Sequence, residues 1–292
     1  MPQSEIVSFQ PATGEELWRG NICDVDEAVA RAREAFPGWA SRPVANRMEL
    51  VRRFANEVRA AADDFAELIA RETGKPLWEA KTEVEAVINK VEISISAYME
   101  RTGQKKLDSA LGGSSAVRHK PHGIMAVLGP YNFPAHLPNG HIVPALIAGN
   151  SVILKHASQT ILVGEHLADA YRAAGVPEDV FQNVVLSHDT TSALIADNAF
   201  DFVNFTGSVG GGQAMERAAA GTFTGVATEL GGKDPAYVRA DANLDAAVDG
   251  VMDGAMFNAG QCCCGIERIY VHESLYDAFV EKAVAWVNNL HL

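Results

Sequence analysis

The sequence predicts an α/β protein in which a doubly wound parallel sheet is followed by a second, incomplete α/β unit. Two observations lead to this expectation. From residue 123 onward, short apolar segments alternate with amphipathic stretches of helical periodicity. The apolar segments have the character of strands that helices cover on both faces of a sheet. We therefore expect strands at residues 123–128, 151–155, 181–186, 201–205 and 226–230.

The amphipathic stretches between these strands predict the helices that cover the sheet. They lie at residues 136–148, 160–174 and 191–198, and a further helix follows Gly210-Gly211-Gly212. Because strand and helix alternate, the strands should run parallel, with helices on both faces. Sheets of this kind bind ligands beyond the carboxyl ends of their strands.

The N-terminal part of the chain is mostly helical by pattern. One helix should end at Pro37-Gly38, a longer one should span 44–71, and a third should span 77–102. The polar stretch 104–121 predicts an extended hairpin or linker. These segments give a predicted division into 1–103, the hairpin at 104–121, a sheet domain at 122–231 and a partial domain at 232–292.

The second unit should contain a helix at 244–257, a turn at 258–265, a strand at 268–271 and a helix from Ser274 to the end. A chain normally closes a domain after its sheet is complete. Here the sequence stops when the new unit has only one or two strands. We therefore expect the second domain to be unfinished.

Composition narrows the class of protein. The net charge of −13 over 292 residues argues against nucleic acid or an anionic membrane as the main partner. We see no secretory signal and no apolar run of about 18 residues that would span a bilayer. Three of the four cysteines are contiguous and cannot form an ordinary disulfide framework among themselves. We expect a reduced, cytoplasmic protein.

The cysteines at 262–264 follow Gln261 in the turn that ends a predicted helix. A thiolate in such a turn can attack a carbonyl, and nearby backbone N–H groups can bind the resulting oxyanion. Burial of the cysteines as small hydrophobic side chains explains the segment equally well. We expect no metal site, because zinc sites use spaced ligands and consecutive thiols do not wrap one ion.

Two further polar residues stand at predicted strand ends. Glu229 precedes Gly231-Gly232, and a partly desolvated carboxylate there suits general-base chemistry. A salt-bridged acid is an equal alternative. Asn132 follows the first strand of the sheet and can donate an amide hydrogen bond, although a simple turn residue explains it better.

The glycine-rich segment at 207–212 lies between a strand and a helix. Its glycines suit a phosphate that meets a helix N-terminus. The segment lacks the G-x-G-x-x-G pattern, because Val209 stands at the second glycine position. A tight turn without a ligand is the alternative.

Taken together and in this order, these four segments resemble the aldehyde dehydrogenase superfamily over essentially the whole chain. The Glu-Thr-Gly-Lys-Pro turn at 72–76 belongs to the resemblance. The stretch 118–141 looks most like succinylglutamate-semialdehyde dehydrogenases. Residues 229–235 and the three cysteines look more like the general and succinate-semialdehyde branches, so the subfamily stays open.

The resemblance implies a catalytic set. The family nucleophile falls two positions after Gln261, at Cys263, and the family base corresponds to Glu229. The Asn132 amide and the Cys263 backbone N–H would form the oxyanion hole. The implied reaction is the NAD(P)-dependent oxidation of a small aldehyde to a carboxylic acid through a Cys263 thiohemiacetal and thioester.

The resemblance also implies NAD or NADP as cofactor. Lys155 would meet the adenosine ribose, and the segment Gly207, Ser208 to Gly212 would meet the pyrophosphate. Leu230 would lie near the nicotinamide. The remaining expected cofactor-binding residues are Pro130, Tyr131 and Ser158.

The chain departs from the family pattern in three ways. Ser158 replaces a glutamate that repels a 2′-phosphate, so we expect NADP to be tolerated or preferred. His141 stands where many members carry a lysine, and packing under the site explains it at least as well as a role in the site. The family continues well beyond residue 292, and its members pair through the hairpin, here 104–121. We expect a homo-oligomer in full-length form. A truncated, non-catalytic paralogue that binds a dinucleotide or a full-length partner is the alternative.

Overall fold

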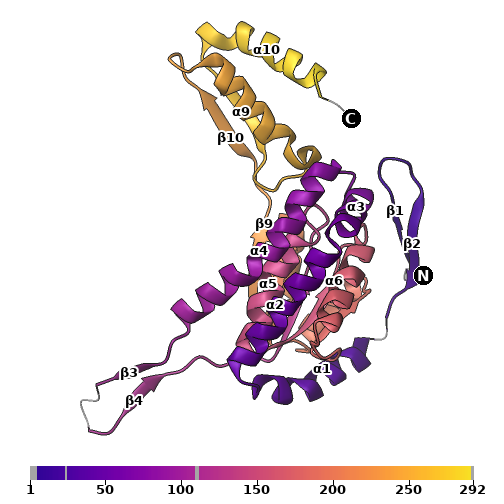
Figure 1. The fold of residues 1–292 in the computed structure, drawn as a ribbon, viewed down its shortest axis with the longest axis vertical. Helices are drawn as coiled ribbons and strands as arrows, with labels where there is room; N and C mark the ends of the chain where they lie inside the picture. The colour runs from indigo at the N-terminus through magenta and orange to yellow at the C-terminus, as the bar shows by residue number, and fades with distance from the viewer. Residues whose placement is uncertain (1–4, 24, 109–111, 291–292) are drawn as a thin grey trace. The chain divides into compact units, whose positions relative to one another are not determined.

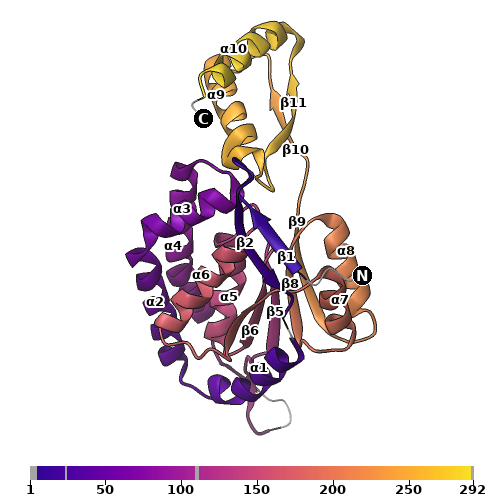
Figure 2. The ribbon, with the colours of Figure 1, turned by 90° about the vertical axis from the view of Figure 1, so that its right-hand side faces the viewer.

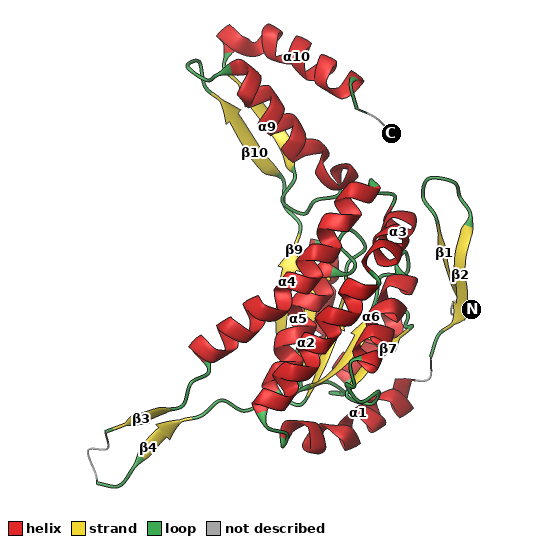
Figure 3. Ribbon diagram, in the orientation of Figure 1, coloured by secondary structure: helices red, strands yellow, loops and turns green. Residues whose placement is uncertain are grey.

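The chain forms two compact units, which are described one by one. The computed structural model describes residues 5–23, 25–108 and 112–290. The first unit is Met1–Glu229 and the second is Leu230–Leu292. Figures 1 and 3 show the elements of both units. The finer division into the predicted domains stays a prediction.

A five-stranded sheet in the order β7-β6-β5-β8-β9 forms the centre of the first unit. Strand β5 pairs in parallel with β6 and β8, and β6 pairs in parallel with β7. The predicted doubly wound parallel sheet is therefore confirmed. The strands are β5 (Ile124–Leu128), β6 (Ser151–Lys155), β7 (Phe181–Val184), β8 (Phe202–Gly207) and β9 (Gly225–Leu230).

Helices cover both faces of this sheet, as Figure 2 shows for α5 and α6 on one side and α7 and α8 on the other. One core cluster joins the sheet to α2–α6, and a second joins it to α1, α7 and α8. Strand β5 is buried along its whole length because its residues alternate between these two cores. The helices are α1 (Val25–Ala40), α2 (Val44–Ala60), α3 (Ala62–Thr73), α4 (Leu77–Arg101), α5 (His136–Ala148), α6 (Ile161–Ala173), α7 (His188–Ala196) and α8 (Val209–Ala219).

Two predictions for the N-terminal helices are wrong. Pro37-Gly38 does not end α1, which continues to Ala40 because buried Trp39 anchors its last turn by donating to the Leu146 carbonyl at 3.1 Å. The predicted helix at 44–71 is two helices, since Ala61 has a non-helical backbone with φ −108°. The break lets Phe54 of α2 and Phe65 of α3 both be fully buried.

Two antiparallel hairpins complete the first unit. One joins β1 (Glu5–Phe9) to β2 (Glu16–Asn21). The other joins β3 (Lys105–Leu107) to β4 (Ser115–Val117) and follows the end of α4 (Figure 1). This second hairpin confirms the extended pairing predicted within 104–121, of which residues 109–111 lie outside the described residues.

The second unit contains a short parallel sheet and two helices. Strand β10 (Asp234–Val238) pairs with β11 (Ile266–Val271), beside α9 (Leu244–Met256) and α10 (Tyr276–Asn288). The short 3₁₀ segments η1 (Phe257–Gly260) and η2 (Glu273–Leu275) precede β11 and α10. A small core of Val238, Val248, Met252 and Phe279 joins these elements.

Strand β10 was not predicted from the sequence. Its first residues, Asp234-Pro235, have the composition of a turn, and proline lacks the N–H of a ladder bond. The register shifts between these two residues, so the proline sits at an irregular strand start where that loss is tolerated. Among the described residues, no helix combines the length and apolar character that crossing a bilayer requires.

Candidate active site

The carboxyl ends of β5, β6 and β8 lie together at one edge of the sheet. In the strand register, Leu128 at the end of β5 lies beside Lys155 of β6 and Phe205 of β8. The chain leaves β5 toward β6 on one side and later returns to β8 on the other, which makes this edge a topological switch point. The predicted residues that the structure gathers here are Pro130, Tyr131 and Asn132 after β5, Lys155 at the end of β6 with Ser158 beyond it, and Gly207 at the end of β8 with Ser208 and Gly212 beyond it.

The segment between β5 and α5, residues 129–135, carries Asn132. Gly129 extends the sheet by donating to the Lys155 carbonyl at 3.0 Å. A Cβ at Gly129 would lie 2.8 Å from Cγ of Pro138, so this turn requires glycine. Asn132 is buried, whereas Tyr131 is 45% exposed. The segment therefore presents one buried and one exposed side chain at the sheet edge.

The glycine-rich turn leads directly into α8. Helix α8 begins at Val209, so Gly210 to Gly212 belong to its first turn and do not precede it as predicted. Ser208 is the N-cap and accepts a hydrogen bond from Gly211 N at 3.1 Å. This polar cap starts the helix before the glycines. A Cβ at Gly211 would lie 2.5 Å from Cζ of Phe205, which explains the glycine there.

The N-terminus of α8 fits a pyrophosphate. It stands at the switch point, where first-turn N–H groups and the helix dipole favour an anion. Lys155 is the cation at the same edge, half-buried at the end of β6, and burial lowers its pKa. Ser158 is exposed and donates to Gln159 Oε1 at 3.3 Å. This set of donors suits a dinucleotide.

His156 directly follows Lys155, the last residue of β6. It is fully buried, and burial lowers its pKa to about 4. Its Nε2 lies 2.7 Å from the Pro134 carbonyl, which can only accept, so Nε2 carries the proton. Its Nδ1 then accepts from the Thr160 hydroxyl at 3.0 Å. A neutral His156 thus joins the segment after β6 to the one after β5.

Glu229 is the penultimate residue of β9, an edge strand of the sheet. Its side chain is exposed, like those of Thr228 and Leu230 at the same end of β9, whereas the sequence predicted partial desolvation. Burial lowers the pKa of His141, and the Glu229 carboxylate opposes this shift. His141 Nε2 also lies 3.5 Å from Thr206 Oγ1 of β8. Helix α5 therefore brings His141 within electrostatic range of the predicted base.

Cys263 belongs to the second unit, in the turn between η1 and β11. Asn258 and Ala259, just before it, adopt positive φ values of 59° and 53°. Cys263 is exposed, which disfavours the reading of these cysteines as buried hydrophobic side chains. Partial burial, with a smaller effect of Cys264, raises the pKa of the Cys263 thiol. A thiolate at neutral pH therefore needs a further group to stabilise it.

The sulfur atoms of the three consecutive cysteines lie close together. The Sγ atoms of Cys262 and Cys264 are 3.5 Å apart, and all three lie within 4.8 Å of one another. The three sulfur atoms are thus closer together than the consecutive positions of the cysteines suggested. The expected absence of a metal site stays a prediction.

The predicted catalytic and cofactor-binding residues divide between the two units. Asn132 and Glu229 belong to the first, whereas Leu230 and Cys263 belong to the second. The pairing of Cys263 with Glu229 therefore stays a prediction.

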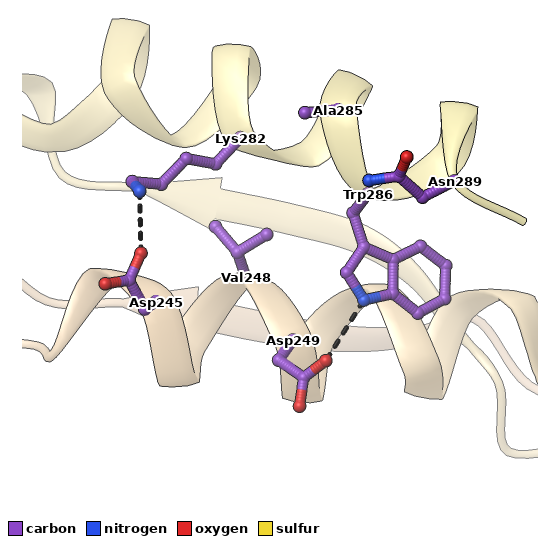
Figure 4. Close-up of a pocket in the computed structure, with 7 residues that line it drawn as sticks. All are labelled: Asp245, Val248, Asp249, Lys282, Ala285, Trp286 and Asn289. Atoms are coloured by element: carbon purple, nitrogen blue, oxygen red, sulfur yellow. Dashed lines mark hydrogen bonds and ion pairs between the residues drawn. The ribbon is translucent and has the colours of Figure 1, made fainter.

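Figure 4 shows a shallow pocket of the second unit, between α9 and α10. Lys282 pairs with Asp245 at 2.7 Å, and Trp286 Nε1 donates to Asp249 Oδ1 at 3.0 Å. The pocket contains none of the predicted site residues.

The sequence did not predict the contacts that position the Asn132 segment. Lys75, in the turn between α3 and α4, donates to the Asn132 carbonyl at 2.8 Å and to Glu83 Oε2 at 2.7 Å. The only available signal was the Glu-Thr-Gly-Lys-Pro turn at 72–76, which gave the resemblance but not this contact.

Comparisons with known proteins agree with this architecture. The chain is 53% identical over 282 residues to N-succinylglutamate 5-semialdehyde dehydrogenase of Novosphingobium aromaticivorans, which covers 96% of the chain and 60% of the relative. It is 51% identical to the protein of the same name from Sphingopyxis alaskensis, over 98% of the chain and 60% of that relative. The chain thus spans 60% of the length of these relatives.

Solved structures share the fold. An E. coli NADP-dependent enzyme matches with a TM-score of 0.92 and 33% identity, over 98% of the chain and 60% of its own. An NAD-dependent benzaldehyde dehydrogenase from Corynebacterium glutamicum matches with a TM-score of 0.89 and 29% identity, over 98% of the chain and 64% of its own. The family model for the aldehyde dehydrogenase family matches residues 1–292. The chain therefore belongs to the aldehyde dehydrogenase family.

Proposed function

We propose that the protein oxidises an aldehyde to a carboxylic acid with NAD or NADP as hydride acceptor. The observation that carries this proposal is the gathering of Asn132, Lys155 and the start of α8 at the switch point of a sheet. This edge offers an amide donor for an oxyanion and a cationic, N–H-rich place for a dinucleotide. The family to which the chain belongs supports the same reaction.

In the proposed mechanism, the Cys263 thiolate attacks the aldehyde carbon and forms a C–S bond. The carbonyl oxygen becomes an oxyanion, which the Asn132 side-chain amide and the Cys263 backbone N–H stabilise. The bound cofactor supplies the acceptor for the hydride that leaves this carbon. Loss of the hydride converts the thiohemiacetal into a thioester on Cys263.

Glu229 completes the proposed cycle. Its carboxylate removes a proton from water, and the hydroxide attacks the thioester carbon. The C–S bond breaks, the acid is released, and the Cys263 thiolate is regenerated. His141, close to Glu229 and kept neutral by burial, leaves the carboxylate free to act as a base.

We propose that the substrate is a semialdehyde, with N-succinylglutamate 5-semialdehyde as the first compound to test. The names of both relatives above support this choice. We also propose that NADP is accepted, since Ser158 is uncharged and lies beyond Lys155 at the sheet edge. A 2′-phosphate would meet no repulsion from the Ser158 side chain, and Lys155 lies at the same edge.

The decisive experiment is a panel of aldehydes with NAD and NADP, together with single alanine variants of the three adjacent cysteines. Cys263→Ala should lower kcat more than about 1000-fold while leaving dinucleotide binding intact. Cys262→Ala and Cys264→Ala are matched controls that should keep most activity. Full activity of Cys263→Ala would overturn the mechanism.

Two other outcomes are informative. Tight dinucleotide binding without turnover of any aldehyde would favour the non-catalytic alternative. A strong preference for NAD in kcat/KM would reject the role given to Ser158, and Ser158→Glu should then have little effect. We further propose a homo-oligomer that pairs through the β3–β4 hairpin, which light scattering of the full-length protein would test.

A further inference from the structure

A fully buried lysine occupies the turn between α3 and α4. Gly74 ends α3 in the left-handed region with φ 74°, and α4 begins at Leu77. The Lys75 side chain in this turn points into the protein, where Glu83 and the Asn132 carbonyl accept its hydrogen bonds. The exposed fraction of its side chain is 0%, as is that of Glu83 on α4.

Lys75 holds the backbone of the residue that carries the proposed oxyanion donor. Its Nζ donates to the Asn132 carbonyl at 2.8 Å and to Glu83 Oε2 at 2.7 Å. The same ammonium lies 4.3 Å from the centre of the Phe133 ring. Charge-assisted hydrogen bonds and cation–π contacts both strengthen when water is excluded.

Glu83 holds the other end of the same segment. Its Oε1 accepts from Ala135 N at 2.8 Å and from His136 N at 3.0 Å, where α5 begins. Between these points, His156 Nε2 donates to the Pro134 carbonyl at 2.7 Å. Buried side chains from α4, from the α3–α4 turn and from the segment after β6 thus fix the peptide between Asn132 and His136.

We propose that Lys75 and Glu83 are positioning residues, whose buried ion pair fixes the peptide from which the Asn132 side chain projects. The inference rests on the proposed function of Asn132. An oxyanion donor accelerates a reaction only when it is held where charge will develop, so that no reorganisation is needed. The ion pair supplies that rigidity from residues 57 and 49 positions earlier in the chain.

A purely structural role is the competing explanation, and the variants must separate the two. Changing Lys75 or Glu83 alone leaves a buried charge, so such a variant can fail to fold. The double variant Lys75→Met/Glu83→Gln removes both charges, and the introduced amide oxygen can still accept from Ala135 N and His136 N. Glu72→Gln is the matched control, because buried Glu72 accepts from Leu162 N and Val163 N of α6, away from residues 129–136.

The first readout does not depend on turnover. Amide hydrogen exchange of peptides covering 131–133 should be at least about tenfold faster in Lys75→Met/Glu83→Gln than in the wild type. Glu72→Gln should leave these peptides unchanged and accelerate exchange at 162–163. Unchanged exchange at 131–133 in the double variant would overturn the proposal.

The second readout is a kinetic cycle with Asn132→Ala. Lys75→Met/Glu83→Gln should lower kcat about 10- to 100-fold, while KM for the dinucleotide changes less than about twofold. Adding Asn132→Ala to this background should then cost much less than it costs in the wild type, because the donor is already misplaced. If the fold losses in kcat caused by Asn132→Ala and by Lys75→Met/Glu83→Gln simply multiply when combined, the proposal would be overturned.

The two readouts also separate this inference from the proposed function. A wild-type chain without aldehyde oxidation would reject the proposed function, and hydrogen exchange alone would then decide whether the ion pair fixes the segment. Normal kcat in a double variant with faster exchange would reject the positioning role and leave the proposed function standing.

Discussion

Helices α5 and α6 begin in the same way but differ in how charge is balanced at their starts. Both pack in the same core, and neither N-cap residue, Ala135 or Thr160, supplies a capping side chain. A buried glutamate from an earlier helix accepts the first N–H groups instead, Glu83 at α5 and Glu72 at α6. The same solution occurs twice, from two neighbouring helices.

The difference lies in the counter-charge. Glu83 pairs with Lys75 at 2.7 Å. Glu72 makes no ion pair within the described part of the chain, and burial raises its pKa to about 7 although two backbone N–H groups oppose the shift. A carboxylate can therefore cap a helix from a distance without a cation, but its charge then becomes sensitive to pH near neutrality.

The largest expected effect is that of Glu83→Ala. It should lower the free energy of unfolding by about 3–5 kcal/mol, because Lys75 would lose its counter-charge while buried. Urea unfolding at pH 7 measures this loss. Lys75→Met/Glu83→Gln should lose clearly less, and equal losses in the two variants would contradict the importance of charge balance at α5.

Glu72→Gln should change how stability depends on pH. The folded-state pKa of Glu72 is about 7 against an ordinary value of 4.5. Its contribution to the free energy of unfolding is therefore fully present below pH 4.5 and is lost as pH rises through 7. Glutamine does not titrate. The stability cost of the variant should therefore shrink by on the order of 2 kcal/mol between pH 5 and pH 8. Urea unfolding at both pH values tests this, and a constant cost would argue against a titrating Glu72.

For His156→Asn, the loss of stability should change with pH in the opposite direction to that of Glu72→Gln. The pKa of His156 is lowered from 6.5 to about 4. Its contribution to the free energy of unfolding is therefore present above pH 6.5 and is lost as pH falls through 4. The cost of the variant should be greatest at pH 8 and smaller by on the order of 2 kcal/mol at pH 5. The same unfolding experiments decide this, and a cost that grows toward acid would mean that His156 is charged in the folded state.

The smallest effect is expected where a helix is capped locally. Ser187 caps α7 by accepting from Thr190 N at 3.0 Å. Ser187→Ala should cost about 1 kcal/mol, with no dependence on pH between 5 and 8. Thermal unfolding of this variant beside Glu72→Gln would show whether distant capping is worth more than local capping.

Much of the fold could be predicted because its signals are local. The helix at 136–148 was predicted residue for residue, since its apolar run ends at Gly149, which has a positive φ of 96°. The break at Ala61 could not be seen, because alanine favours helix and only tertiary packing bends the chain there. Strand β10 was missed for the reverse reason, since Asp234-Pro235 imitates a turn.

The site followed from the sequence only in part. The strand pattern predicted a ligand-binding edge with Asn132 and the glycine-rich turn at 207–212, because parallel strands bring their carboxyl ends together. Lys155 was expected there only through the family resemblance. The hydrogen bond from Lys75 to the Asn132 carbonyl had no such signal in the sequence. Lys75 lies 57 positions from Asn132, and a lysine in a Gly-Lys-Pro turn has the composition of an exposed loop. Glu229 was expected to be partly desolvated, yet it is exposed together with its neighbours at the end of β9.

The complete burial of the Lys75 side chain has a consequence for chemical labelling of the protein. An amine with no exposed surface cannot meet an acylating reagent, so the folded protein should protect Lys75 from acetylation while exposed Lys81 of α4 reacts. Acylation of Lys75 would report each transient opening of the turn between α3 and α4. Mass spectrometry of the peptide that contains Lys75 would therefore measure how often the α3–α4 turn, which holds the Asn132 backbone, opens.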